Sequence, residues 1–455
     1  MRGIFADTRP LRTPAYMRMF LAQIVTVVGA QFSIVAVPQQ IYEITGSSAY
    51  VGLSGIVALV PLVLFGLWGG ALSDAMDRRT LLVVSTAGLI LTTFGLFLQA
   101  VLGNENVWVV LALLAAQQSF FSVGNPTRTA ILPRLLPIDQ LPAAASLNTT
   151  VMSFGAVAGP VLAGALIPAI GLGALYLLDS VAMLATLWAA VRLPGLPPES
   201  ASGVPGLRSV IAGFVYLAQQ KVLLASYVVD LVAMVFGMAR ALFPEIAHES
   251  FGDPASGGFA LGILYASMAA GALLGGVFSG WVSRIERHGL AVLWSVAGWG
   301  LAVIGFGAVV LLASPGDGSW LLALAALFLA LGGAADLISS SFRQAILLSA
   351  ANEDMRGRLQ SVFYIVVAGG PRLGDWSHGY AGAMFGPAPA VIGGGALVLA
   401  GTAASSLGFP AFRRYRAGEG TGESGRRASD SSGRRAQDGP GGQGSSGVRE
   451  TPVSG

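Results

Sequence analysis

Two long hydrophobic runs with a short charged segment between them constrain this chain most. Residues 51–72 and 80–103 contain no ionisable side chain, and residues 73–79 read Ser-Asp-Ala-Met-Asp-Arg-Arg. Each run has about the 20 residues that a helix needs to cross a bilayer. Inside hydrocarbon, an open-ended chain can satisfy its backbone hydrogen bonds only as a helix. We therefore expect two membrane-spanning helices joined by a tight turn at one membrane face.

The same hydropathy pattern continues along the chain. Apolar residues make up 54% of the sequence and charged residues 11%, against about 25% charged in a soluble domain. The pattern predicts an all-α polytopic membrane protein with about twelve spans. The predicted spans are 18–42, 50–72, 80–102, 107–123, 147–169, 172–191, 222–243, 259–282, 290–313, 320–341, 359–384 and 388–407.

The distribution of arginine predicts the orientation of these spans. Basic residues such as Arg79, Arg134 and Arg284 lie in even-numbered connections, whereas the odd-numbered connections hold acidic residues and no lysine or arginine. Short loops rich in arginine stay in the cytoplasm. We therefore expect both termini to be cytoplasmic, in the cell (plasma or inner) membrane, with no cleavable signal peptide.

The chain divides into two similar halves. Gly159-Pro160 recurs as Gly370-Pro371, and the segment that begins at Arg128 recurs at Arg343. We predict a cytoplasmic N-terminus (1–17), a six-helix bundle (18–192), a linker (193–221), a second six-helix bundle (222–412) and a disordered cytoplasmic tail (413–455). Within the linker, residues 208–221 have the apolar spacing of a helix that lies on the membrane surface.

Several functional classes are excluded by what the sequence lacks. Without cysteine there is no disulfide, thiolate metal site or cysteine nucleophile, and three scattered histidines argue against a metal site. No glycine-rich Lys-Ser/Thr phosphate loop is present, so that motif cannot supply ATP-driven energy. We expect no enzyme, no catalytic residues and no cofactor. The energy source is predicted to be an ion gradient, most simply protons. The arginines occupy loops and the tail, so nucleic acid is not expected as a partner.

The charged segment carries a family resemblance. Its glycine, leucine, acid and paired arginines resemble the loop between the second and third helices of the major facilitator superfamily, in the form found in the branch with the enterobactin exporter and macrolide efflux proteins. These positions are Gly70, Leu72, Asp74, Arg78 and Arg79. The chain departs from the common pattern at Ala75 and Asp77. The resemblance implies a major facilitator fold of two pseudo-symmetric six-helix halves, with substrate bound between them.

The resemblance also implies a gate at Asp74. In the family the equivalent acid docks against the start of the eleventh helix, here near Arg358, and closes the cytoplasmic side. The alternative is a solvated loop charge that only sets topology, and Arg78 is open to the same interpretation.

A second motif lies in the fifth span. Gly155, Gly159, Pro160 and Gly164 resemble the glycine-proline motif of family exporters. Small residues permit close helix packing and proline bends a helix, so the motif is interpreted as a hinge, a packing seam, or both. By resemblance it favours export over import.

Charges inside the spans are costly and therefore indicate function. The candidates for proton coupling or intramembrane charge are Asp179, Asp230, Asp336, Asp375, Arg240 and Arg372. Arg372 and Asp375 are three residues apart and are expected to pair, as a mobile or a static bridge. Asp230, with no basic residue one turn away, is the preferred proton site. Asp179 is expected to cap or pair near the outer side, and Asp336 to neutralise Arg343.

Polar and aromatic side chains in the first and fourth spans are candidates for a substrate cavity. These are Gln31, Phe32, Gln117, Gln118 and Phe121. Interhelical hydrogen bonding or core packing is the alternative for each. The fourth span lacks the arginine found in many drug/proton antiporters of the family, so coupling through that residue is not expected.

Taken together, these patterns predict a monomeric secondary transporter that exports a small amphipathic molecule by proton antiport and alternating access. A drug, a siderophore or another secreted metabolite would fit. The alternatives are a lipid or lysolipid flippase of the same fold, and a membrane sensor that binds but does not transport.

Overall fold

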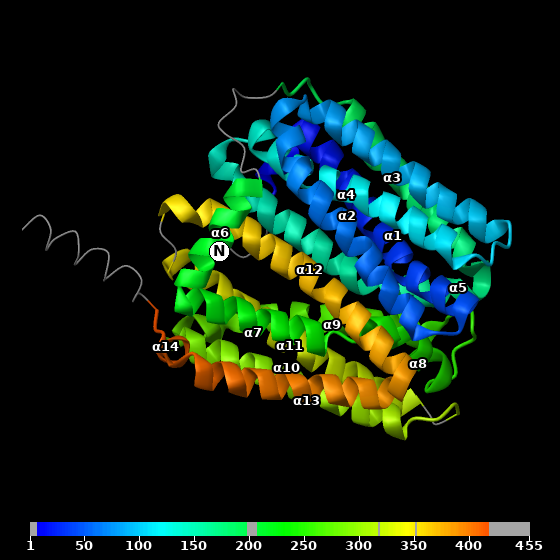
Figure 1. The fold of residues 1–455 in the computed structure, drawn as a ribbon. Helices are drawn as coiled ribbons and strands as arrows, with labels where there is room; N and C mark the ends of the chain where they lie inside the picture. Colours follow the sequence, from blue (N-terminus) through cyan, green and yellow to red (C-terminus); the bar gives the residue numbers. More distant parts are fainter. Residues whose placement is uncertain (1–6, 198–206, 317–318, 351–352, 418–455) are drawn as a thin grey trace, which may run out of the picture.

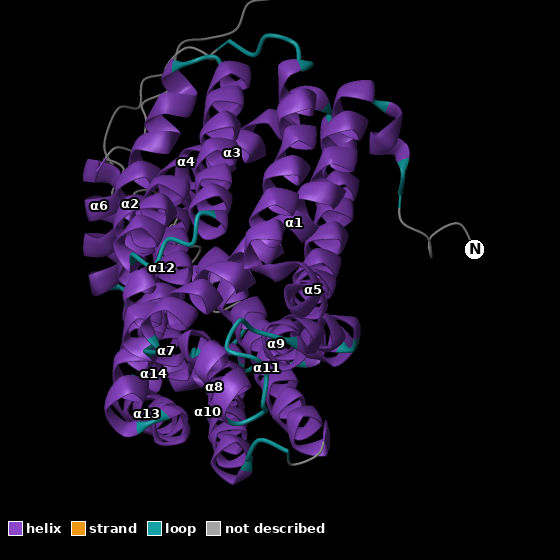
Figure 2. Cartoon of the chain, turned by 90° about the vertical axis from the view of Figure 1, so that its right-hand side faces the viewer, coloured by secondary structure: helices purple, strands orange, loops and turns teal. Residues whose placement is uncertain are grey.

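The computed structural model describes residues 7–197, 207–316, 319–350 and 353–417, and these residues form an all-helical bundle without a strand (Figures 1 and 2). The predicted disordered tail falls largely outside the described residues, as does the middle of the linker. Within these described ranges, ten helical stretches are long and apolar enough to cross a membrane. One of them spans residues 138–191, and α12, 33 residues long, is an additional long helix.

The first half of the chain forms one six-helix bundle. Its helices are α1 (Pro14–Thr45), α2 (Ser48–Ala75), α3 (Arg78–Val101), α4 (Val107–Leu135) and α5 (Leu141–Val191). Gly171 breaks α5 into two spans, because its φ of 77° lies in the left-handed region that favours glycine. Helix α1 packs against α5, and α2 and α3 pack against α4.

The second half repeats this arrangement (Figure 1). Its helices are α7 (Lys221–Gly237), α8 (Phe243–Glu249), α9 (Phe259–Val277), α10 (His288–Leu312), α11 (Ser319–Ala350), α12 (Glu353–Phe385) and α13 (Pro387–Gly408). Helix α10 packs against α11 and α13, as α3 packs against α4 and α5. The predicted twelve-helix architecture is therefore confirmed.

The seventh span differs from the prediction. Sequence hydropathy indicates one helix over residues 222–243, whereas α7 ends at Gly237 and the chain continues through the 3-10 helix η3 (Arg240–Leu242) into α8. Pro244 occupies the first turn of α8, where its missing N–H costs nothing. Irregular backbone at this depth is tolerated where it is buried in protein or lines a cavity.

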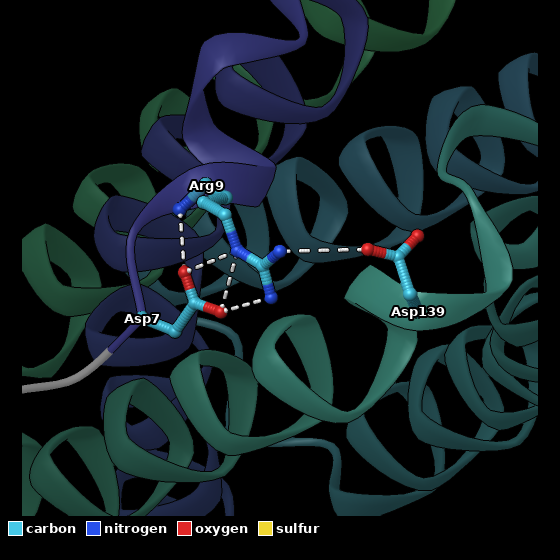
Figure 3. A network of polar contacts seen from close by, with 3 residues as sticks. All are labelled: Asp7, Arg9 and Asp139. Atoms are coloured by element: carbon cyan, nitrogen blue, oxygen red, sulfur yellow. Dashed lines mark hydrogen bonds and ion pairs between the residues drawn. The ribbon is translucent and has the colours of Figure 1, made fainter. Parts of the chain in front are cut away.

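Short polar segments cover one end of the bundle, which we call the near end. The 3-10 helix η1 (Arg9–Arg12) meets η2 (Ile138–Gln140) through Arg9 and Asp139, whose charged atoms are 3.5 Å apart (Figure 3). Arg9 also hydrogen-bonds Asp7 and lowers the pKa of that carboxyl. The C-terminal helix α14 (Pro410–Arg414) lies at the same end.

The linker helix also lies at the near end. Helix α6 (Leu207–Gln219) covers most of the predicted surface helix and packs against α12. Its Ile211, Phe214 and Val215 leave about half of their surface uncovered by protein. A helix with such an apolar face suits the membrane interface.

Candidate functional site

The two halves meet through small residues at the end of the bundle opposite η1 and α14, which we call the far end. Here α5 crosses α9, and Gly164 lies against Gly258 and Gly262. A Cβ added at Gly262 would lie 2.6 Å from the carbonyl oxygen of Pro160 and 3.0 Å from the Cα of Gly164. Backbone therefore packs directly on backbone, which only glycine permits at these positions.

A second close contact joins α2 to α12. A Cβ at Gly52 would lie 2.7 Å from the carbonyl oxygen of Asp375, and the Ser48 hydroxyl donates a hydrogen bond to the Gly379 carbonyl at 3.2 Å. Nearer to the other end, Leu59 still meets Gly369, whereas no described atom lies within 4 Å of a Cβ at Gly66. Among the described residues, the contact between the halves is thus concentrated at the far end.

Two hydrogen bonds reinforce this closure. Gln39 donates from Nε2 to the Ala255 carbonyl at 2.8 Å, and the Tyr42 hydroxyl donates to Glu249 at 3.2 Å. In both bonds a residue of α1 reaches α8 or the loop that follows it. We call the two glycine contacts and these bonds the far-end seam.

The predicted glycine-proline motif of α5 contacts helices of both halves of the molecule. Gly155 faces Val27 and Gly159 faces Gln31, so this part of α5 packs closely on α1 within the first half. Pro160 and Gly164 lie on roughly the opposite face of α5, and they pack on α9 of the second half. Two faces of the same helix segment therefore connect the inner packing of one bundle with the seam between the bundles.

A cavity of about 410 Å³ lies between the halves. Ligand sites typically have volumes of about 300–1,000 Å³, so it can hold a small molecule or part of a larger one. Most of its wall is apolar. The polar residues in the wall are Ser33, Ser54, Gln117, Gln118, Asp179, Arg240, Tyr265, Arg372 and Asp375. Among the described residues, no group of three or more acids or histidines could hold a metal ion.

The structure separates the predicted cavity residues into two groups. Gln117, Gln118 and Phe121 line the cavity, and Gln117 also donates to Thr93 at 2.8 Å. Phe32 instead belongs to the buried core, and Gln31 packs against Gly159. Other residues of α1 line the cavity instead, and Ser33 is the polar one among them.

Sequence reasoning missed three polar lining residues, Ser33, Ser54 and Tyr265. Serine and tyrosine are common on helix faces of every kind, so nothing in the sequence alone marks these three. Helical spacing from Gln117 and Gln118 does not reach them, because they lie on α1, α2 and α9.

The expected pair of Arg372 and Asp375 is replaced by a pair between different elements. Asp375 of α12 binds Arg240 of η3, with 3.1 Å between Nη2 and Oδ2. The break after α7 brings Arg240 to the cavity wall, and sequence spacing within α12 could not reveal this partner. Arg372 points its Nη2 toward Gln118 Oε1 of the first half, at 3.5 Å.

Asp179 lies in the opposite wall of the cavity and is fully buried. Its Oδ2 accepts a hydrogen bond from the Ser33 hydroxyl, and its Oδ1 has no hydrogen-bond partner among the described residues. The sequence predicted a capping or pairing role near the outer side. The structure instead places a carboxyl group without a cationic partner in the described residues beside the space between the halves.

Asp230 has a different environment from the one that the sequence indicated. It pairs with Arg343 of α11, and both side chains are almost fully buried, with 2% and 3% of their surfaces exposed. The premise that Asp230 is unpaired is therefore wrong: its partner lies on a helix distant in the sequence. Asp336 also faces Arg343, at 3.8 Å, as expected.

The charged segment at the near end ties the first half together. Asp77 caps α3 by accepting from Thr80 N at 3.1 Å, and it also accepts from Leu196 N at 2.9 Å. Arg78 donates to the Ala130 carbonyl and Arg79 to the Val191 carbonyl, at 3.2 and 2.6 Å. A cation at Val191 is favourable, since α5 ends there with the negative end of its dipole.

The remaining residues of the predicted gate lie outside what the structure describes. Gly70, Leu72 and Asp74 belong to the last turns of α2, and the side chains of residues 67–75 are not described. The same holds for the side chain of Arg358, the expected docking partner. The gate role of Asp74 stays a prediction.

The sequence is similar to a known protein family and to individual transport proteins. The family described as "Transmembrane secretion effector" matches residues 5–414. The enterobactin exporter EntS of Citrobacter koseri is 30% identical over 412 residues, covering 89% of this chain and 94% of EntS. EntS of Shigella boydii is 29% identical over 380 residues, covering 82% and 86% of the two chains.

Solved structures share the fold at low sequence identity. The nucleoside transporter NupG superposes with a TM-score of 0.66 at 11% identity, covering 88% of this chain and 99% of NupG. A bacterial homologue of the iron transporter ferroportin, in an inward-facing state, gives a TM-score of 0.65 at 15% identity, covering 88% and 98%.

The far-end seam predicts a strong effect of added side-chain volume. We expect Gly262→Val to lower the melting temperature of the purified protein, because the new methyl groups meet the backbone of Pro160 and Gly164. Overpacking of this kind costs about 1–3 kcal/mol. Gly298→Val is the matched control, because nothing lies within 4 Å of a Cβ there. Equal melting temperatures for the two variants would contradict the seam.

The pair of Asp230 and Arg343 predicts a partner-dependent loss of stability. Asp230→Ala should destabilise the protein by about 3–5 kcal/mol, because it leaves a buried guanidinium without its main counter-charge. Asp230→Ala combined with Arg343→Met should recover much of the loss in thermal unfolding. If the double variant melts no higher than the single one, the pair is not a structural ion pair.

Proposed function

The chain belongs to the transmembrane secretion effector family of the major facilitator superfamily, and from this we propose that it exports a small amphipathic molecule by proton antiport and alternating access. The observation that carries the proposal is the cavity between the two halves, closed at the far end by the seam of small residues. Such a cavity at a repeat interface is where transporters of this type bind substrate.

The proposed direction of opening follows from the charge pattern. If arginine-rich connections mark the cytoplasm, the near end is cytoplasmic and the far-end seam faces outward. The structure then corresponds to a state in which the outer side is closed. Rocking of the halves would part the seam and release substrate outside. Glycine-to-glycine contacts suit such a joint, since they interlock no large side chains.

The proposed substrate class is a siderophore or a related secreted metabolite. Relatives at about 30% identity over most of the chain are named as enterobactin exporters. The cavity wall, largely apolar with a few polar and charged groups, suits an amphipathic molecule. Enterobactin is therefore the first compound to test.

We propose Asp179, rather than Asp230, as the proton carrier. Asp230 is already engaged by Arg343, whereas Asp179 has a carboxylate oxygen without a partner among the described residues and lies at the cavity. The groups that share the cavity with it are Ser33 on α1, and Arg240, Arg372 and Asp375 across the space. Entry of the substrate would change the charges and the hydration around Asp179, and therefore whether its carboxyl group holds a proton.

Reconstituted vesicles test both parts of this proposal. Proteoliposomes with an acidic lumen should concentrate radiolabelled enterobactin, and a gradient of about one pH unit supports roughly tenfold accumulation per proton exchanged. Asp179→Asn should still exchange labelled for unlabelled enterobactin but should not concentrate it. Asp139→Asn, which changes an exposed acid far from the cavity, should behave as the wild type.

Each contrary result removes a different part of the account. If the Asp179→Asn variant still concentrated enterobactin, this acid would be excluded as the proton carrier. If the wild type accumulated enterobactin equally with and without a pH gradient, proton antiport would be excluded. Movement of fluorescent lipid without enterobactin would favour a flippase. Binding of enterobactin without any exchange would favour a sensor.

A further inference from the structure

The charges around the cavity are divided between the two halves. The first half contributes one ionisable group to the wall, Asp179, beside Ser33. The second half contributes Arg240, Arg372 and Asp375. No ion pair joins Asp179 to either arginine among the described residues, so the cavity has an acidic wall facing a wall with two cations.

Within the second half, one of the two arginines is neutralised. Arg240 and Asp375 form a close ion pair at 3.1 Å, with a third or less of each side chain exposed. Their charges therefore largely cancel for anything that enters the cavity. The net positive charge of this wall resides on Arg372.

Arg372 has donors to spare. A guanidinium carries five N–H donors, and with the described residues Arg372 makes a single hydrogen bond, of 3.5 Å to Gln118. That length is at the outer limit for a hydrogen bond, so the contact is weak. A cation at this depth in a membrane protein is energetically costly, because it loses hydration. Its presence therefore indicates a function.

The surroundings of Arg372 indicate what it binds. The cavity that Arg372 lines is walled largely by apolar residues of both halves, including Leu62, Phe121 and Val367. An anionic group held by the guanidinium, with an apolar body against these residues, would satisfy the charge and the shape together. Arginine binds carboxylate-like groups in a bidentate manner, with strong charge-assisted hydrogen bonds.

We infer that Arg372 forms an anion-binding subsite, and that the transported molecule carries an ionised acidic group on an otherwise apolar or aromatic body. This inference rests on the proposed function, because it names the chemistry of that same substrate. Gln118, which now faces the guanidinium, would turn to the ligand or be displaced by it. The anion would then lie between Gln118 of the first half and Arg372 of the second.

Binding of a matched pair of probes tests the subsite. Naphthoate and naphthamide have the same aromatic body, but only naphthoate carries a negative charge at neutral pH. Equilibrium dialysis with the purified full-length protein should show tighter binding of naphthoate. Arg372→Gln should weaken naphthoate binding by about tenfold to a hundredfold, since hydrogen bonds to charged groups contribute about 1.5–3 kcal/mol. Naphthamide binding should remain unchanged, which also shows that the variant is folded.

Two further variants sharpen the result. Arg372→Lys should retain part of the preference for naphthoate, because it keeps the charge but loses the bidentate geometry. Arg192→Gln, a change at an exposed arginine that stacks on Trp188 outside the cavity, should leave both affinities unchanged. A shift caused by general loss of positive charge would appear in both glutamine variants.

Three outcomes would overturn the subsite. These are equal affinity of the wild type for the two probes, absence of naphthoate binding, and an unchanged preference in Arg372→Gln. None of these measurements requires transport. Binding of naphthoate through Arg372 without movement of enterobactin would therefore refute the proposed export but support the subsite. Transport of enterobactin without Arg372-dependent binding of naphthoate would support export but refute the subsite.

Discussion

The close approach of backbone to backbone at the far-end seam is the contact on which the rest of the structure depends. In a membrane, helices gain little from burying apolar side chains, because lipid is equally apolar, so association relies on close packing and hydrogen bonds. Gly164 against Gly262 and Gly52 against Gly379 supply that packing at the far end. Among the described residues, the two halves touch most closely there, and the cavity lies between them.

The intramembrane charges are organised by the same division into halves. Asp230 and Arg343 neutralise each other inside the second half, where they connect α7 with α11. Arg240 and Asp375 do so at the cavity wall. Of the charged groups that line the cavity, those without a strong partner in the described residues are Asp179 on one side and Arg372 on the other. These two groups therefore carry the proposals for the proton and for the substrate.

The fold was predictable from the sequence, because a bilayer requires long apolar helices and hydropathy detects these directly. Residues 18–42 and 388–407 were found as spans for that reason. The break after Gly237 was not found, since the residues around it, apart from Arg240, are as apolar as those of a continuous helix. The sequence also could not reveal ion-pair partners that are distant along the chain. The spacing of Arg372 and Asp375 favoured a local pair, whereas Arg240 reaches Asp375 from another element.

The central claim is that the two halves move relative to each other and that the far-end seam opens and closes. Spin labels at Glu105 and Pro315, in exposed loops of the two halves, would report the distance across that end by double electron–electron resonance in nanodiscs. The account predicts one distance that matches this structure and a second, longer one, with populations that shift when pH or enterobactin is changed. A single distance, unchanged under every condition, would contradict it.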